Sequence, residues 1–415
     1  MPTIPTPGPS MPLAGVRVVE ISSFVAVPLA GMTLAQLGAE VIRVDPAGGA
    51  ADYRRWPLAE SGTSIYWTGL NKGKRSVAVD MRSPDGQELI ARLIAESGPT
   101  GGILITNVVG RQWHSYEQLV TRRPDLIHLE VSGRSGGGTG VDYTVNAGLG
   151  FPLVTGPPTE TGPINHVLPA WDVACGLYAA LGVTAALRHR DATGAGSRIR
   201  LPLEDVALAT ASNLGFLTEP MVNGTQRQRL GNAIYGQYGQ TFTSSDGVAF
   251  MLVALTARHI RDLTELTGTA AAVAALEESL GVDFADEGHR FEHRDALGAL
   301  FTPWFAGHRA DEIAAGLAGT SILWERYRSF AEAAADEKVT GNPLFAPLQQ
   351  PGIGEYLASG LPLSVDGVHI PAVPAPALGD DTAAVLAERL GLSAQEVAAL
   401  DDAGTVASAS VEADR

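Results

Sequence analysis

A regular alternation of short β-branched runs with helical stretches constrains this chain more than any other feature. The runs 16–21, 40–45 and 76–80 are strongly apolar, and Pro28 opens a helical stretch of small residues between the first two. A strand–helix–strand order of this kind gives two parallel strands joined by a right-handed crossover. The alternation continues to residue 131, which predicts an α/β fold with a large, doubly wound, Rossmann-like domain.

At 415 residues the chain is long enough for two domains, and its character changes beyond residue 222. Residues 240–255 contain two apolar runs joined by the turn 244–247, the pattern of a β-hairpin, and Ala-rich helical stretches follow. We therefore expect a smaller α+β domain after the first. The predicted parts are a disordered N-terminus at 1–12, the large domain at 13–222, the small domain at 223–335, a return to the large domain at 336–406 and a disordered tail at 407–415.

The charge and cysteine content narrow the function classes. The formal net charge is -16 at pH 7, whereas nucleic acid binding needs a basic face to neutralise phosphates. The one cysteine, Cys175, can form no intramolecular disulfide, so we expect the protein to be located in the cytoplasm. The N-terminal segment has no basic and apolar regions of a signal peptide. Glycines interrupt the longest apolar stretch, 173–187, so we expect a buried helix and no membrane span.

The turn after the first predicted strand lacks a dinucleotide fingerprint. Such a site has the pattern G-x-G-x-x-G, but residues 22–28 read Ser-Ser-Phe-Val-Ala-Val-Pro. This argues against a nicotinamide-dependent dehydrogenase, although the strand–helix alternation is Rossmann-like.

A short cluster of cations favours an anionic ligand. Residues 71–75 read Asn-Lys-Gly-Lys-Arg just before a predicted strand, and the glycine permits close approach of a phosphate to the backbone. Arg43 and Arg111 fall near predicted strand ends or in the loops that follow, where open α/β sheets bind ligands. The alternative for 71–75 is a solvated surface turn.

Asp172 is a candidate for chemistry because it precedes a long helix of small residues. We expect it at the N-cap, where the helix dipole stabilises the anion and keeps it available for attack. The simpler alternative is that Asp172 only caps the helix. Cys175, three residues later, is either a thiol nucleophile paired with His166 or a small core residue, as single cysteines usually are.

A second pattern lies far along the chain. His289 and His293 match H-x-x-E-H, which binds zinc in one class of metalloproteases. The stretch is highly charged and no further ligand is evident nearby in the sequence. We therefore expect a solvated helix face and no metal site.

Several stretches, in a fixed order along the chain, resemble those of one enzyme family. They are the opening strand–helix–strand at 13–45, Asp52 to Trp56, 71–76, Thr106-Asn107, Pro169 to Asp172 and the Gly-rich turn 193–197. Each is modest alone, but in this order and spacing they resemble the family III CoA-transferases, from about residue 13 to about residue 406. The resemblance implies a Rossmann-like large domain and a smaller α+β domain in an interlocked homodimer.

The resemblance also implies the site. Asp172 becomes the covalent nucleophile, coenzyme A is part of the substrate, and neither a tightly bound cofactor nor a metal is needed. The implied CoA-binding residues are Phe24, Val25, Ala26, Arg43, Asn71, Lys72, Lys74, Arg75, Asn107, Val108 and Arg111. The expected substrate-binding residues are Tyr143, Asn146, His166, Gln237 and Tyr238. The segment 236–240 is either a flexible cover for the site or merely the lead-in to the hairpin.

Within the family, 24–34, 69–75, 141–146 and 165–172 most resemble members that move CoA between the two ends of one unsaturated C5 dicarboxylate. Val25 stands where oxalate-using members carry a polar residue. Val141 stands near the position at which related racemases carry their catalytic histidine. Both departures argue against those activities. The open alternatives are intermolecular transfer to another acid, a CoA-binding protein without catalysis, and a zinc hydrolase.

Overall fold

The computed structural model describes residues 11–408, which divide into two compact units. The large unit comprises the described parts of 1–149, 167–217 and 340–415, and the small unit comprises 150–166 and 218–339. The small unit thus includes 150–166, which the sequence placed with the large domain. The predicted disorder at the termini falls mostly on 1–10 and 409–415, outside the described residues.

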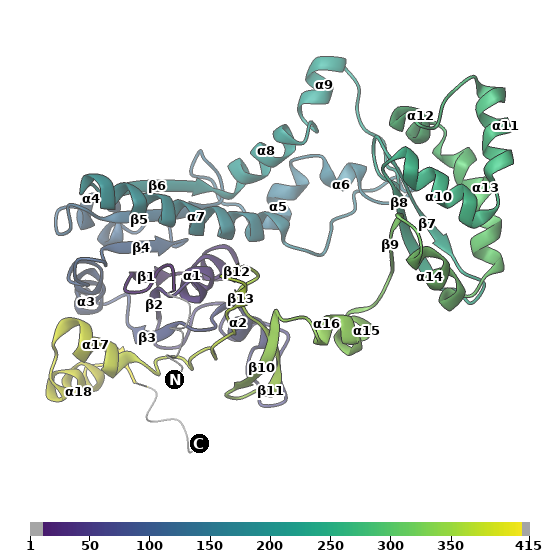
Figure 1. Ribbon diagram of the computed structural model, residues 1–415. Helices are drawn as coiled ribbons and strands as arrows, with labels where there is room; N and C mark the ends of the chain where they lie inside the picture. The colour runs from purple at the N-terminus through teal and green to yellow at the C-terminus, as the bar shows by residue number, and fades with distance from the viewer. Residues whose placement is uncertain (1–10, 409–415) are drawn as a thin grey trace, which may run out of the picture. The chain divides into compact units, whose positions relative to one another are not determined.

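The large unit is built on a seven-stranded sheet in the order β14-β3-β2-β1-β4-β5-β6 (Figure 1). Its strands are β1 (Arg17–Ile21), β2 (Glu40–Asp45), β3 (Arg75–Val79), β4 (Ile103–Thr106), β5 (Ile127–Ser132), β6 (Ser197–Pro202) and the short β14 (Val406–Ala407). Strands β1 to β6 are parallel, and Val19 pairs with Ile42 on one side and Leu104 on the other. The predicted parallel, doubly wound sheet is confirmed.

Helices cover both faces of this sheet. They are α1 (Ala26–Gln36), α2 (Ile65–Leu70), α3 (Pro84–Ala95), η1 (Gln112–His114), α4 (Tyr116–Leu119), α5 (Asp142–Ala147), α7 (Ala170–Thr193), α8 (Leu203–Asn213), α17 (Thr382–Leu390) and α18 (Ala394–Asp402). Val19 and Leu104 point to one face and form a core with α3, α17 and α18. Two hairpins, β10 (Phe345–Gln350) with β11 (Gly354–Ser359) and β12 (Ser364–Val365) with β13 (Val368–His369), complete the unit.

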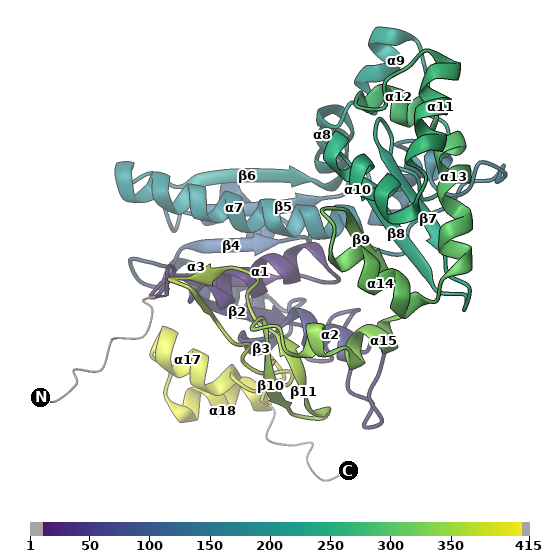
Figure 2. The same cartoon turned by 45° about the vertical axis from the view of Figure 1, so that its right-hand side comes forward.

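Helix α7 lies along β5 and β6 and packs against α1 (Figure 2). By length and composition alone it could cross a membrane. Its inner face, however, is part of the core of the large unit, where Cys175, Ala179 and Val183 are fully buried. Gly182 lets the helix approach the sheet, since a Cβ there would lie 3.3 Å from Leu129 Cδ1. The apolar stretch is thus a helix buried along one face, so the predicted buried helix is confirmed only in part.

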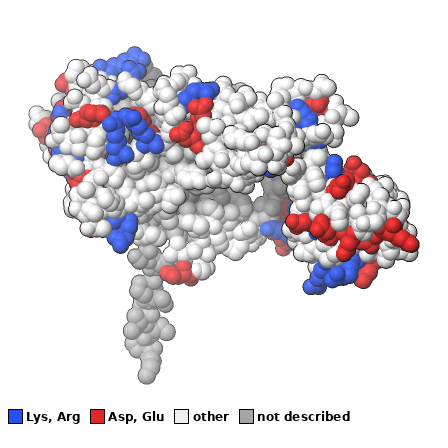
Figure 3. Space-filling model, turned by 90° about the horizontal axis from the view of Figure 1, so that it is seen from above, with Lys and Arg blue, Asp and Glu red and all other residues white. Residues whose placement is uncertain are grey.

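The small unit pairs a three-stranded antiparallel sheet with helices. The strands are β7 (Tyr238–Thr243), β8 (Ala249–Ala254) and β9 (Leu323–Arg326), and the helices are α6 (Phe151–Val154), α9 (Thr218–Asn223), α10 (Ala257–Thr267), α11 (Ala270–Leu280), α12 (Glu287–Glu292), α13 (Arg294–Gly307), α14 (Ala310–Ala318), α15 (Phe330–Ala335) and α16 (Glu337–Thr340). Strands β7 and β8 confirm the predicted hairpin. Phe242 stacks on Phe305 in the core, with ring centroids 4.3 Å apart. Figure 3 shows acidic side chains gathered on the surface of this unit.

Candidate active site

The strand order of the large unit reverses between β1 and β4, and ligands of such sheets bind at this switch point. The loops that follow these two strands are joined there by one side chain. Asn107 Oδ1 accepts a hydrogen bond from the backbone N–H of Ser23 at 3.0 Å, and its Nδ2 donates to the Ser23 carbonyl at 2.8 Å. The loop after β1 is therefore held at the edge where the resemblance expects CoA.

The next residue in this loop, Phe24, has a strained backbone. Its φ is 66°, a conformation that is costly for a bulky side chain. The Phe24 N–H donates to Asp52 Oδ2 at 3.0 Å, which fixes the turn, and the ring remains 41% exposed. Helix α1 begins directly afterwards with no side-chain cap and no acidic residue in its first turn. Its N-terminus therefore keeps the positive end of the helix dipole and unpaired N–H groups for an anion.

A buried network of charges supports this loop from beneath. Arg43 Nε lies 2.8 Å from Asp45 Oδ2, and Lys74 Nζ lies 2.8 Å from Glu20 Oε1. Lys74 Nζ also donates to Asn71 Oδ1 and to the Pro28 carbonyl, both at 2.8 Å. Burial lowers the pKa of Lys74 to about 8, against the opposing effect of Glu20. The network links the ends of β1, β2 and β3.

These contacts do not support direct binding of a CoA phosphate by most of the predicted cations. Arg43 and Lys74 are buried among protein partners, and Lys72 Nζ donates to the Ser359 carbonyl at 2.9 Å. Arg75 pairs with Glu40 and Glu388, with nitrogen–oxygen distances of 2.9 and 2.8 Å. The sequence showed a run of cations but not the carboxylates beneath it. The 71–75 segment is therefore neither a solvated turn nor a free cationic patch.

Asp172 lies in the first turn of α7 and not at its N-cap. The helix begins at Ala170 after Pro169, which has no capping side chain. The capping role falls instead to Asp142, the first residue of α5, whose Oδ2 accepts hydrogen bonds from the N–H groups of Trp171 at 2.8 Å and Asp172 at 3.2 Å. The carboxylate of Asp172 is thus not engaged as a cap, and the predicted N-cap position was wrong by three residues.

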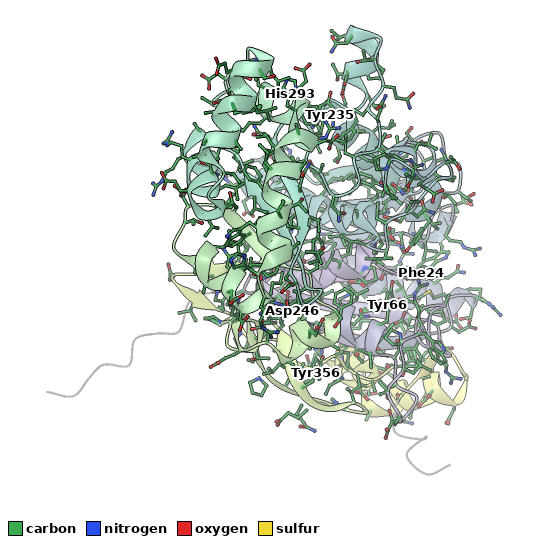
Figure 4. All side chains as sticks on the ribbon, turned by 90° about the vertical axis from the view of Figure 1, so that its right-hand side faces the viewer. Phe24, Tyr66, Tyr235, Asp246, His293 and Tyr356 are labelled. Carbon is green, nitrogen blue, oxygen red and sulfur yellow. The ribbon has the colours of Figure 1, made fainter. Side chains whose placement is uncertain are left out.

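The surroundings of Asp172 favour its neutral form. Burial and, to a smaller extent, the negative charge of Asp142 raise its pKa to about 6, against the opposing positive charge of Arg55. The guanidinium carbon of Arg55 lies 4.9 Å from the ring centroid of Tyr66 and 5.5 Å from that of Phe24. Phe24 and Tyr66 are labelled close together in Figure 4. A carboxylate ionised near neutral pH but poorly stabilised is well suited to act as a nucleophile.

Gly176, one turn after Asp172, allows α7 to reach the start of α1. A Cβ at this position would lie 2.7 Å from the Ala26 carbonyl oxygen, too close for any real side chain. The first turn of α7, which carries Asp172, is therefore brought near the uncapped N-terminus of α1. Cys175 faces inward and is fully buried, and burial raises its pKa to about 12. Its thiol is a core group, and the alternative of a thiol nucleophile is wrong.

The predicted substrate residues separate into two sets. Tyr143 and Asn146 belong to α5: Tyr143 is half exposed, and Asn146 Oδ1 accepts a hydrogen bond from Trp171 Nε1 at 3.1 Å. His166 and Gln237 belong to the small unit, where Gln237 Nε2 donates to Glu287 Oε2 at 2.5 Å.

Tyr238, the last predicted substrate residue, is part of the core of the small unit. Its side chain is fully buried, its ring centroid lies 6.0 Å from that of Phe301, and burial raises the pKa of its hydroxyl. It cannot contact a substrate in this position, so that prediction is corrected. Because β7 begins at Tyr238, the end of the segment 236–240 is a strand, which supports the hairpin lead-in and not the flexible cover.

The histidine pattern is in the small unit as well. His289 is half-buried on α12, with Nδ1 3.0 Å from the Asp283 carbonyl oxygen, and His293 follows the end of that helix. Across residues 11–408 no three histidine, cysteine or acidic side chains are grouped so that they could hold a metal ion. Figure 4 labels His293 beside Tyr235, whose ring lies 5.2 Å from that of Phe291.

The sequence assigned no role to three residues of this site: Arg55, Tyr66 and Asp142. Arg55 and Asp142 occur in stretches that carried the family resemblance, but nothing local shows that a carboxylate 30 positions away caps α7. The pattern Tyr66-Trp67 reads as an ordinary apolar helix turn. Only the packing of separate loops brings the three groups near Asp172.

Comparisons with known proteins define the class. Residues 13–382 match the family model for CoA-transferase family III, so this chain belongs to the family III CoA-transferases, which act on CoA thioesters. It is 48% identical over 399 residues to 2-methylfumaryl-CoA isomerase from Chloroflexus aurantiacus, covering 95% of this chain and 98% of the relative. It is 29% identical to a succinate–glutarate CoA-transferase from Agrobacterium fabrum, over 92% of this chain and 96% of the relative. A crystal structure of a CAIB/BAIF family protein from Brucella suis shares 27% identity with a TM-score of 0.75, covering 91% of this chain and 99% of the other.

Proposed function

We propose that this enzyme moves CoA between the two carboxyl ends of one unsaturated C5 dicarboxylate, converting mesaconyl-C1-CoA into mesaconyl-C4-CoA. Mesaconate is 2-methylfumarate, the acid in the name of the relative that is 48% identical. The observation that carries the chemical part is the carboxylate of Asp172, which has no ion-pair partner among the described residues and a pKa raised to about 6. The family provides the substrate class, a CoA thioester.

The reaction proceeds through covalent aspartyl intermediates. The Asp172 carboxylate attacks the C1 thioester carbonyl, which forms a mixed anhydride and releases CoA thiolate. The thiolate attacks the aspartyl carbonyl of the anhydride, so that Asp172 carries the CoA thioester and the acid is a free dicarboxylate. The C4 carboxylate then attacks this thioester and releases thiolate. Thiolate attack on the C4 carbonyl gives the product and restores the Asp172 carboxylate, with no net proton uptake.

Backbone groups stabilise the charge that develops on the carbonyl oxygen. The uncapped N-terminus of α1 offers N–H groups near Asp172 because Gly176 lets the two helices meet. Fixed donors of this kind need no reorganisation during the reaction. Asp142 holds the start of α7 through two hydrogen bonds and thereby fixes the backbone position of the nucleophile.

For CoA itself we propose the loop edge formed by Phe24, Val25, Ala26, Asn107 and Val108, with Arg111 nearby. The side chain of Asn107 joins the two loops, and Arg111 is exposed at the start of η1. The buried cations Arg43, Lys72 and Lys74 then act by holding this edge in shape, and Arg75 ties β3 to α17 through Glu388.

We also propose that the enzyme works as a homodimer in the cytoplasm. Three apolar side chains on the outer face of α7, Leu177, Tyr178 and Leu181, are 52%, 52% and 60% exposed. A second copy of this chain is the occupant that the family resemblance implies for such a face. The mass in solution, measured by light scattering, tests this part of the proposal.

The decisive experiment incubates the enzyme with mesaconyl-C1-CoA and no added acid. Appearance of the C4 regioisomer is expected, and its absence would overturn the isomerase. Isotope-labelled free mesaconate is then added to unlabelled substrate. Product with little label means that the acid is retained in each cycle. Full equilibration of the label would instead assign intermolecular transfer, the activity named in the succinate–glutarate relative.

A further inference from the structure

Arg55, whose positive charge acts on Asp172, has no carboxylate partner among the described residues. Its guanidinium carbon lies over the rings of Phe24 and Tyr66, 5.5 and 4.9 Å from their centroids, and the residue is exposed. No ion pair of Arg55 occurs within residues 11–408, whereas Arg43 and Arg75 are each paired with several carboxylates. These two cation–π contacts hold the guanidinium in place and leave its N–H donors for a ligand.

The position of Arg55 relates it to the nucleophile. Its positive charge acts on the carboxylate of Asp172, and both act on the hydroxyl of Tyr66. Arg55 and Asp172 nevertheless do not form an ion pair, so their charged groups are separated by more than contact distance. A small anion bound at the edge of Arg55 therefore lies near the reacting carbonyl without displacing Asp172.

We propose that Arg55 binds the free carboxylate of a dicarboxylyl-CoA substrate, at the end of the acyl group that is not reacting. Planar, bidentate binding of a carboxylate is the geometry that guanidinium favours. This inference rests on the proposed function and deepens it.

Such a contact also explains how the acid stays bound after CoA has moved to Asp172. At that stage the acid is a dicarboxylate with no covalent link to the protein. Arg55 holds one carboxylate while the other attacks, and exchange of the two ends within the pocket completes the transfer. Retention raises the effective concentration of the attacking group and excludes other acids.

The first test measures binding in an unreactive background. In Asp172→Asn protein, Kd is measured by calorimetry for mesaconyl-CoA and for crotonyl-CoA, which lacks the second carboxylate. Adding Arg55→Gln is expected to raise the Kd for mesaconyl-CoA about 10- to 100-fold, the range of a charge-assisted hydrogen-bonded pair. The Kd for crotonyl-CoA is expected to rise less than about threefold. Equal weakening of both ligands, or no change in either, would overturn the proposal. The matched control is Arg54→Gln, since Arg54 is the exposed neighbouring arginine.

The second test measures retention in the active enzyme. With labelled mesaconate present, Arg55→Gln is expected to raise the label fraction of the C4 product about tenfold or more over wild type. The label fraction for Arg55→Lys is expected to lie between those of wild type and Arg55→Gln. A label fraction unchanged in Arg55→Gln contradicts the retaining role. Should the wild type not isomerise mesaconyl-C1-CoA, the proposed function fails while the binding comparison still decides the role of Arg55.

Discussion

Two groups of carboxylates in the large unit differ in how their charge is balanced. Glu20 and Asp45 lie within ion-pair distance of Lys74 and Arg43, and together these residues hold the loop after β1. Asp142 accepts hydrogen bonds from the backbone at the start of α7, and its negative charge acts on Asp172. Neither carboxylate forms an ion pair within the described chain. Balanced charge gives a rigid support, whereas burial and the nearby charge of Asp142 raise the pKa of Asp172 to about 6, which fits the proposed role of its carboxylate.

The largest effect is expected at Asp172. Asp172→Ala removes the proposed covalent nucleophile, so turnover is expected to fall by about 10⁴-fold or more. The fold should persist because Asp142, and not Asp172, caps α7. Turnover is followed by chromatography of the two regioisomers, and hydroxylamine with substrate is expected to modify Asp172 alone. Asp191→Ala, an exposed change in the last turn of the same helix, is the control. Residual activity within tenfold of wild type would refute the mechanism.

A stability measurement tests the ion-paired carboxylate Glu20 and its partner Lys74. Lys74→Met removes the nearer of two ion-pair partners of the fully buried Glu20 and is expected to lower the free energy of unfolding by about 3–5 kcal/mol. Urea titration measures this loss, and Arg111→Met, at an exposed site, is expected to change stability by less than about 0.5 kcal/mol. If Lys74→Met instead left stability unchanged and raised KM for the CoA substrate, Lys74 would be the phosphate ligand that the sequence predicted.

The smallest effect is a shift along the pH axis. Attack requires the Asp172 carboxylate, so kcat/KM is expected to fall about tenfold per pH unit below pH 6. Asp142→Asn retains an oxygen acceptor for the two backbone bonds but removes a negative charge, so the pKa of Asp172 falls and the acidic limb moves to lower pH. Arg55→Gln removes a positive charge and moves the limb to higher pH. Shifts in the same direction for both variants would contradict this account of the charges.

Much of the fold followed from the sequence, and less of the site did. The β-branched runs correctly predicted β1, β2 and β3 because their apolar pattern depends only on neighbouring residues. The Asn-Lys-Gly-Lys-Arg segment was misread because burial of Lys74 depends on Glu20, 54 residues away. Tyr238 was misplaced because an aromatic residue in a polar segment gives no sign of the core it enters. In each case a partner distant in the sequence decided the outcome.

The side chain of Asn107 has a consequence for when the enzyme becomes active during folding. It joins loops whose residues are 84 positions apart, on strands β1 and β4 that come from separate halves of the sheet. Contacts of such long range form late, because the entropy of closing the loop must be overcome first. A partly folded chain that contains only β1 to β3 therefore lacks the complete edge that we propose for CoA. We accordingly expect reactivity toward thioesters only when both halves of the sheet have joined.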